Sequence, residues 1–219
     1  MTGFPASPRV IKGGIVLLDP ATAAVLRVIA LQYNPDSLTR SLQPQGVEPQ
    51  GQSRAEALRL RGPPIETLRL EAELDATDRL AEPDQHPDTV AHGLFPDLAA
   101  LEGLAYPDSS RLQANAALAA SGALEIAPME SALCLFVWSR ARVLPVRLTE
   151  FSVTEEAFDP MLNPIRAKVT LGLRVLTVDD FGFAHRGGSL FMGYLQGKER
   201  LAAMARQPGL SALGLAGVP

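Results

Sequence analysis

The histidines and nearby acidic residues are the side chains of this sequence that could most readily form a chemical site. Asp84, His86, Asp88 and His92 lie in one short run, and both residue types bind metals in proteins. Prolines break this run, so we expect a polar loop without the fixed geometry of a closed zinc site. We therefore predict a solvated loop rather than a metal centre. The third histidine, His185, stands beside Arg186 and two glycines, and we expect it in a turn.

Two pairs of adjacent carboxylates could serve as a general acid and base, Glu155–Glu156 and Asp179–Asp180. Neighbouring residues on a strand point to opposite faces, so neither pair converges on one substrate atom. The single cysteine, Cys134, lies in the apolar run ALCLFVW, where a core thiol is expected. No phosphate-binding loop, dinucleotide-binding glycine motif or HExxH zinc motif is present. We predict a protein without enzymatic activity, cofactor or metal.

Composition favours a single β-rich domain. The chain has 219 residues, 47% of them hydrophobic, so a sizeable core can form. The formal charge of −4, without a dense Lys/Arg run, argues against nucleic acid as the main partner. No apolar run reaches the ~20 residues that span a bilayer, and the first residues lack a secretory signal. We expect a soluble protein made in the cytoplasm.

The strongest structural signal is a pair of extended segments between residues 144 and 176. In the second segment apolar and polar residues alternate, which is typical of a strand with one face buried and one in water. The apolar face holds Ala167, Val169, Leu171, Leu173 and Val175, and the polar face holds Arg166, Lys168, Thr170, Gly172 and Arg174. In the first segment the alternation changes phase at Glu150, which predicts a β-bulge. The two segments are predicted to form a long hairpin.

Further strands are predicted at 11–19, 24–33, 37–42, 65–76 and 132–138. The first two should pair across a turn at 19–22, and the strand at 24–33 should be buried on much of both faces. The strand at 65–76 alternates cleanly and should have one wet face. Helices are expected at 90–104 and at 189–204, the latter with Ser189 as its N-cap. Residues 111–120 could be another helix or a disordered insertion.

The rest of the chain is expected to consist of loops and arms around one domain at 10–206. Residues 1–9 should be a flexible arm, 43–64 a long loop or arm, and 207–219 a flexible tail. Residues 79–122 should form an inserted loop and helix, beginning with a polar loop at 79–88. A turn-rich loop is expected at 179–188.

Four strings carry a resemblance to a known family. They are VIALQYNPDSLTRS at 28–41, PIETLRLEAELDATD at 64–78, LPVRLTEFSVTEEAFDPMLNPIRAKVTLGLRVLT at 144–177 and QGKERLAAMA at 196–205. Their order and spacing resemble the CIS tube proteins, the tube-type baseplate subunits of contractile injection systems, which are related to phage-tail baseplate proteins. The resemblance covers most of the chain from about residue 10 to 205.

This resemblance implies a mainly β (α+β) fold: a tail-tube-like antiparallel barrel or sandwich with a long hairpin and two or three peripheral helices. It also implies a structural subunit of a sixfold ring, which adapts the inner tube to the spike at the baseplate hub. The implied partners are copies of the chain itself, the inner tube protein, the spike or hub protein and other baseplate subunits, without nucleic acid or membrane insertion. Longer members carry a LysM peptidoglycan-binding module, and none is expected here after residue 205.

The positions that match the family's short motifs are candidate turn or interface residues, and the sequence leaves both roles open. They are Tyr33, Asn34 and Pro35 in the first motif, and Glu155, Phe158, Asp159, Pro160, Leu162, Asn163 and Pro164 in the second. The charged residues expected on wet strand faces could line a lumen or form ion pairs at a rim. They are Arg147, Arg166, Arg174, Glu71 and Glu73.

Two alternative functions remain open at the level of the sequence. One is a tail-tube-like shaft protein, which should form long filaments unaided, whereas a hub adaptor should stop at one layer. The other is a stand-alone β-barrel that binds a ligand or depends on a metal, with its site near 84–92.

Overall fold

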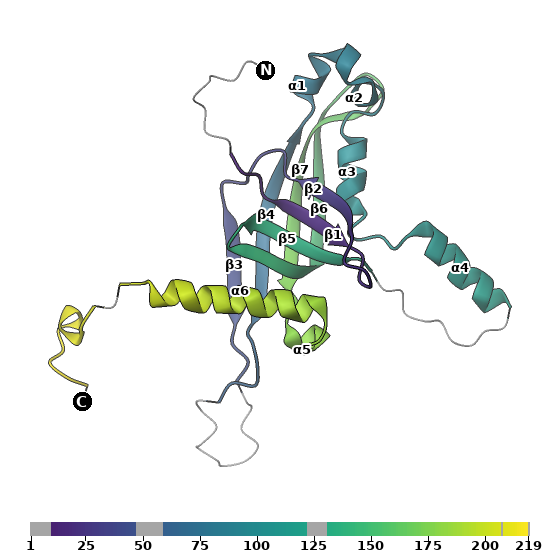
Figure 1. Cartoon of the computed structure of the whole chain (residues 1–219). Helices are drawn as coiled ribbons and strands as arrows, with labels where there is room; N and C mark the ends of the chain where they lie inside the picture. The colour runs from purple at the N-terminus through teal and green to yellow at the C-terminus, as the bar shows by residue number, and fades with distance from the viewer. Residues whose placement is uncertain (1–9, 47–58, 122–130, 207, 219) are drawn as a thin grey trace.

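The computed structural model describes residues 10–46, 59–121, 131–206 and 208–218. The predicted arm at 1–9 and most of the predicted loop at 43–64 lie outside these residues. Within them the chain forms one seven-stranded sheet in which all neighbouring strands are antiparallel, in the order β2-β1-β5-β6-β7-β4-β3. The sheet is open and ends at β2 and β3 (Figure 1). The prediction of a mainly β, antiparallel α+β fold is confirmed.

The strands are β1 (Gly14–Leu18), β2 (Val25–Ala30), β3 (Leu38–Gln43), β4 (Ile65–Asp75), β5 (Leu133–Ser139), β6 (Arg142–Phe158) and β7 (Pro164–Val175). Figure 1 shows β4, β6 and β7 as long strands that run together toward the end of the molecule where α1 and α2 lie. β1 and β5 contribute Ile15 and Phe136 to the same apolar core as Leu68 of β4 and Leu171 of β7. The sheet therefore curls so that its two halves enclose one core.

The hairpin of β6 and β7 is confirmed, including its bulge. The register slips between Leu148 and Glu150, so Thr149 has no partner on β7 and the strand changes phase there. Glu150 lies opposite Gly172, where an added Cβ would stand 2.7 Å from the Glu150 Cβ. The bulge thus places the Glu150 side chain against the backbone of β7, and glycine supplies the space.

The strand at 24–33 is correctly predicted as part of a hairpin with β1, but its predicted burial is wrong. Asp19 closes the β1–β2 turn by accepting hydrogen bonds from the backbone of Ala21 and Thr22 at 3.0 and 2.7 Å. β2 forms an edge of the sheet, and Val25, Leu26 and Val28 are each more than half exposed. An apolar segment is usually predicted to be buried. β2, however, lies at the edge of the sheet with a strand neighbour on one side only, and most of its side chains stay exposed.

The predicted helix at 90–104 is two helices, because glycine breaks it. α2 (Pro87–His92) ends at Gly93, whose φ of +57° is a left-handed conformation, and α3 (Phe95–Glu102) follows. A Cβ at Gly93 would lie 2.5 Å from the Pro164 carbonyl oxygen. The predicted polar loop at 79–88 also contains short helices, α1 (Thr77–Leu80) and η2 (Pro83–Gln85). α3 still buries Leu98 and Leu101 in the core, as its spacing predicts.

Two C-terminal predictions need correction as well. The loop at 179–188 includes helix α5 (Val178–Phe181), which Thr177 and Asp180 close at its start in a capping box. The last long helix, α6 (Arg186–Ala203), begins before Ser189, and its N-cap is His185, whose Nδ1 accepts a hydrogen bond from the Gly187 backbone at 3.0 Å. Serine is the commoner cap, but here the imidazole takes that role and stacks on the Phe181 ring.

The remaining helices are α4 (Ser109–Ala120) and η3 (Leu210–Leu213). For 111–120 the structure selects the helical alternative, with Asp108 as N-cap. α4 buries none of its residues and stands away from the sheet in Figure 1. α6 crosses the end of the sheet opposite α1 and α2, and packs Phe191 and Tyr194 into the core.

Candidate assembly interfaces

The second motif forms the turn between β6 and β7, and Asp159 organises it. Its Oδ1 accepts hydrogen bonds from the backbone of Met161 and Asn163, both at 2.8 Å, and its Oδ2 accepts one from Asn163 Nδ2, also at 2.8 Å. The Leu162 backbone donates to the Asp159 carbonyl at 3.0 Å. Hydrogen bonds from the side chain and backbone of Asn163 lower the pKa of Asp159. The aspartate is therefore ionised at neutral pH and fixes the turn.

This turn is joined to the break between α2 and α3. Asn163, which is buried, donates from Nδ2 to the Ala91 carbonyl at 3.3 Å. The Leu94 backbone donates to the Pro164 carbonyl at 2.9 Å. The turn role predicted for Asp159, Asn163 and Pro164 is therefore present in the structure. Glu155 is exposed, Phe158 is 48% exposed and Leu162 is 74% exposed, so the same motif also presents side chains to water.

The first motif holds the segment after β2 against two other parts of the chain. Asn34 accepts a hydrogen bond from the Gly13 backbone at 2.8 Å and donates to the Ile11 carbonyl at 2.9 Å. The preceding residue, Gln32, exchanges two hydrogen bonds with the backbone of Asp75 at 2.7 and 2.9 Å. Asn34 thus closes a chain reversal that Pro35 follows, while Tyr33 stays 47% exposed.

The two edges of the sheet differ in what they expose. β2 presents the apolar residues Val25, Leu26 and Val28, which are 62%, 58% and 63% exposed. β3 is mostly polar, with Thr39, Ser41 and Gln43 exposed. Each edge strand has unused backbone donors and acceptors on its outer side, within the described part of the chain. Both edges can therefore accept another strand, and β2 also offers apolar contact.

The charges predicted on wet strand faces do lie there. Glu71, Glu73, Arg147 and Arg166 are exposed, and Arg174 is partly buried, with an ion pair to Asp180 at 2.8 Å.

The register brings several of these charges together. Arg166 lies opposite Asp75 on β4 and Glu156 on β6, and Glu73 lies opposite Lys168. An ion pair joins Lys168 to Glu156 at 3.9 Å on this face. Tyr33, Glu73, Asp75, Glu156, Arg166 and Lys168, with Leu74 and Ala167, line a shallow depression of about 380 Å³. Whether this face lines a lumen or forms a rim stays a prediction.

Sequence reasoning missed a buried charged cluster between the sheet and α6. Glu66 is 3% exposed, and its carboxylate accepts hydrogen bonds from the Tyr194 hydroxyl at 3.1 Å and from Lys198 Nζ at 3.3 Å. Arg40 of β3 lies 3.6 Å from the same carboxylate. Lys198 Nζ also lies 4.6 Å from the centre of the Tyr194 ring. The alternation of β4 could have predicted the burial of Glu66, because Glu66 shares the inward face of the strand with Leu68 and Leu70.

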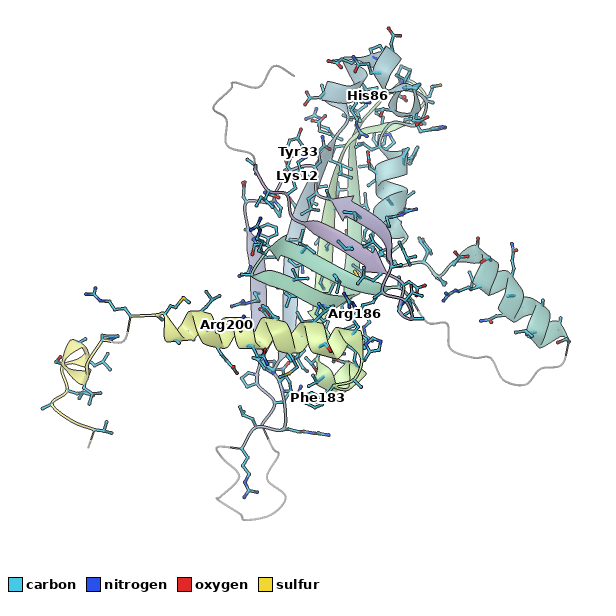
Figure 2. All side chains as sticks on the ribbon, viewed as in Figure 1. Lys12, Tyr33, His86, Phe183, Arg186 and Arg200 are labelled. Carbon is cyan, nitrogen blue, oxygen red and sulfur yellow. The ribbon has the colours of Figure 1, made fainter. Side chains whose placement is uncertain are left out.

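The residues considered for chemistry are not brought together. Figure 2 shows His86 at the end of the molecule near α1 and α2, whereas Arg186, the neighbour of His185, lies at the opposite end. Within the described residues, no group of three or more His, Cys, Asp or Glu side chains could hold a metal ion.

The two carboxylate pairs and the cysteine have structural surroundings. Asp180 caps α5 and pairs with Arg174, while Glu155 and Glu156 occupy successive positions of β6 and so face opposite sides. Burial raises the pKa of the Cys134 thiol to about 12, so it is protonated at neutral pH. A protonated thiol is a poor nucleophile.

Comparison with protein-family models gives no match, and comparison with curated proteins gives none either. Among the described helices, none combines the length and apolar character needed to cross a membrane.

Proposed function

We propose that this protein is a structural subunit of a contractile injection system, a baseplate or tube-initiating hub adaptor that forms a ring between the inner tube and the spike. Support comes from the short motifs at 33–35 and 155–164, which resemble those of the CIS tube proteins. Further support comes from the antiparallel sheet with its long β6–β7 hairpin and its two open edges.

One observation carries the ring proposal: β2, an edge strand paired on one side only, exposes Val25, Leu26 and Val28 to water. Edge strands with exposed apolar residues are ready to pair with another chain, and isolated proteins normally protect them with charge or proline. Arg27 is the only charged residue of β2. In a ring, β2 of one copy would pair with β3 of the next, so the sheet would continue from subunit to subunit.

The proposal is tested by the size of the assembled particle. We expect the purified protein, alone or mixed with its tube and spike partners, to form a closed ring visible by mass photometry and electron microscopy. The double variant Leu26→Lys/Val28→Lys should abolish the ring, because like charges and lysine desolvation oppose pairing at the edge. Leu118→Lys on α4, a site that is 53% exposed, is the matched control and should leave the ring intact.

Three results would overturn the proposal. A protein that stays monomeric with both partners present is not a ring subunit. Unaided growth into long filaments would favour the shaft-protein alternative over the adaptor. Rings that persist in Leu26→Lys/Val28→Lys would show that β2 does not form the contact.

A further inference from the structure

The end of the molecule opposite α6 holds large apolar side chains in water on a rigid frame. Met161 and Leu162, in the β6–β7 turn, are 69% and 74% exposed, and Phe158 just before the turn is 48% exposed. The turn that carries them is fixed by the three hydrogen bonds to the Asp159 carboxylate and by the Asp159 backbone, which donates to the Asn163 carbonyl at 3.0 Å. These side chains are therefore presented in one arrangement rather than on a loose loop.

Leu162 occupies a backbone conformation that suits leucine poorly. Its φ of +66° is the left-handed region, where Cβ crowds the carbonyl oxygen and where glycine or asparagine is more favourable. The leucine side chain gains no burial within the chain that would offset this strain. Strained backbone positions of this kind cluster at active sites and ligand-binding sites.

Two more exposed apolar side chains belong to the same end. Val90 is 42% and Phe95 45% exposed, and they flank the α2–α3 break, whose Ala91 and Leu94 backbones bond to Asn163 and Pro164. We name the set Phe158, Met161, Leu162, Val90 and Phe95 the tip patch. Apolar groupings on an otherwise polar surface mark sites of interaction.

The surroundings of the tip patch are acidic. The segment 77–104 carries six acidic residues against a single arginine, Arg79, and that arginine is already paired with Asp97 at 2.5 Å. The acidic residues are Asp78, Glu82, Asp84, Asp88, Asp97 and Glu102. From the hairpin, Glu155 and Asp159 add negative charge, whereas the nearest cation of β7, Arg166, lies opposite the carboxylates of Asp75 and Glu156. A partner with positive charge around an apolar centre would complement this surface.

We infer that the tip patch is a docking surface for a partner protein segment that presents apolar side chains flanked by lysine or arginine. Apolar side chains of the partner cover Met161, Leu162 and the neighbouring phenylalanines, and its cations lie against the acidic rim. This inference rests on the proposed function, which identifies the partner as a protein of an adjoining layer of the particle. It is separate from the β2 edge, because it lies at the end of the strands.

The test uses a fluorescein-labelled amphipathic peptide built of leucine and lysine, and a peptide of equal length built of leucine and glutamate. By fluorescence anisotropy, the wild-type protein should bind the Leu/Lys peptide, more weakly as salt rises, and should bind the Leu/Glu peptide at least tenfold more weakly. Met161→Ser/Leu162→Asn should weaken Leu/Lys binding at least tenfold. Asparagine tolerates φ of +66°, so the turn is retained.

Two controls separate the tip patch from general effects. Ala157→Gly relieves another positive φ, of +52°, without removing a large apolar side chain, and should bind as the wild type does. Val28→Ser removes an exposed apolar side chain from β2 instead and should also bind normally.

Equal binding by Met161→Ser/Leu162→Asn, or equal affinity for both peptides, would overturn the inference. If that double variant instead abolishes self-association of the peptide-free protein, the occupant is a second copy, and the basic–apolar partner is wrong. Particle size is measured on the same samples. If rings form but the peptide does not bind, only the docking inference is overturned. If the peptide binds but no rings form, only the proposed ring is overturned.

Discussion

The two edge strands of the sheet, β3 and β2, differ in how firmly they are held to the rest of the chain. Arg40 of β3 forms an ion pair with the Glu66 carboxylate, which also accepts hydrogen bonds from Tyr194 and Lys198 of α6. These contacts hold β3 to α6. Among the described residues β2 has no comparable ion-pair cluster, and Val25, Leu26 and Val28 are each more than half exposed. The contrast indicates that the β3 edge contributes to the stability of the subunit, whereas the exposed side chains of β2 contribute little to it.

The largest effect is expected from Glu66→Gln, which removes the buried charge beneath β3. Arg40 and Lys198 would lose their counter-charge, and we expect the free energy of unfolding to fall by about 2 kcal/mol. Their side chains are 35% and 32% exposed, so water screens part of the loss. Urea denaturation followed by circular dichroism measures the change. Glu150→Gln, which breaks the exposed pair with Arg69, is the control and should cost less than about 0.5 kcal/mol.

A smaller loss is expected from Tyr194→Phe. The substitution keeps the ring in the core and under Lys198 but removes the hydroxyl that donates to Glu66, so stability should fall by about 1 kcal/mol. The same denaturation experiment measures it, with Tyr106→Phe, at a site 73% exposed, as the neutral control. An unchanged midpoint in Tyr194→Phe would mean that the β3 edge does not depend on this cluster.

Val28→Thr on β2 should change the stability of the dissociated subunit by no more than about 0.5 kcal/mol, because the side chain is already 63% exposed. The same substitution at Val169, which is fully buried on β7, should cost at least about 1 kcal/mol, because it buries a hydroxyl. Thermal unfolding at a concentration where the protein is dissociated measures both. Comparable losses at the two sites would contradict the contrast between edge and core.

The smallest effect concerns pH and the turn that leads into β2. Hydrogen bonds from Thr22 lower the pKa of Asp19, so the folded state holds the ionised form more strongly than the unfolded chain does. The stabilisation is present above the ordinary aspartate pKa of about 3.9 and is lost as pH falls through the lower folded-state pKa. Asp19→Ala should therefore reduce the loss of stability between pH 5 and pH 3, measured by urea denaturation at each pH. A pH dependence identical to that of the wild type would argue against this contribution.

Much of the sheet could be predicted because the alternation of apolar and polar residues indicates which face of a strand is buried. Leu68, Leu70 and Leu74 predicted the inward face of β4, and the phase change at Glu150 predicted the bulge. Apolar runs without alternation say less. The exposure of β2 depends on its place at the edge of the sheet, which is a tertiary property that no local pattern encodes.

The helical parts and the interfaces were less predictable for related reasons. The break at Gly93 arises from close approach to Pro164, which is distant in sequence. His185 as a helix cap and Glu66 as a buried ion both depend on partners from other elements. The turn role of Asp159 and Asn163 could be predicted from residue type alone, because these side chains bond to nearby backbone. The exposure of Met161 and Leu162 could not.

The long strands beneath the tip have a mechanical consequence. β6 runs for 17 residues, and β7 is paired along most of its length with β6 on one side and β4 on the other. In an antiparallel sheet the backbone hydrogen bonds lie perpendicular to the strands. A pull on the tip along the strand axis therefore loads many of these bonds in shear at the same time, instead of opening them one after another. The β4, β6 and β7 strands should therefore resist extension along their axis more strongly than strands whose hydrogen bonds break one at a time.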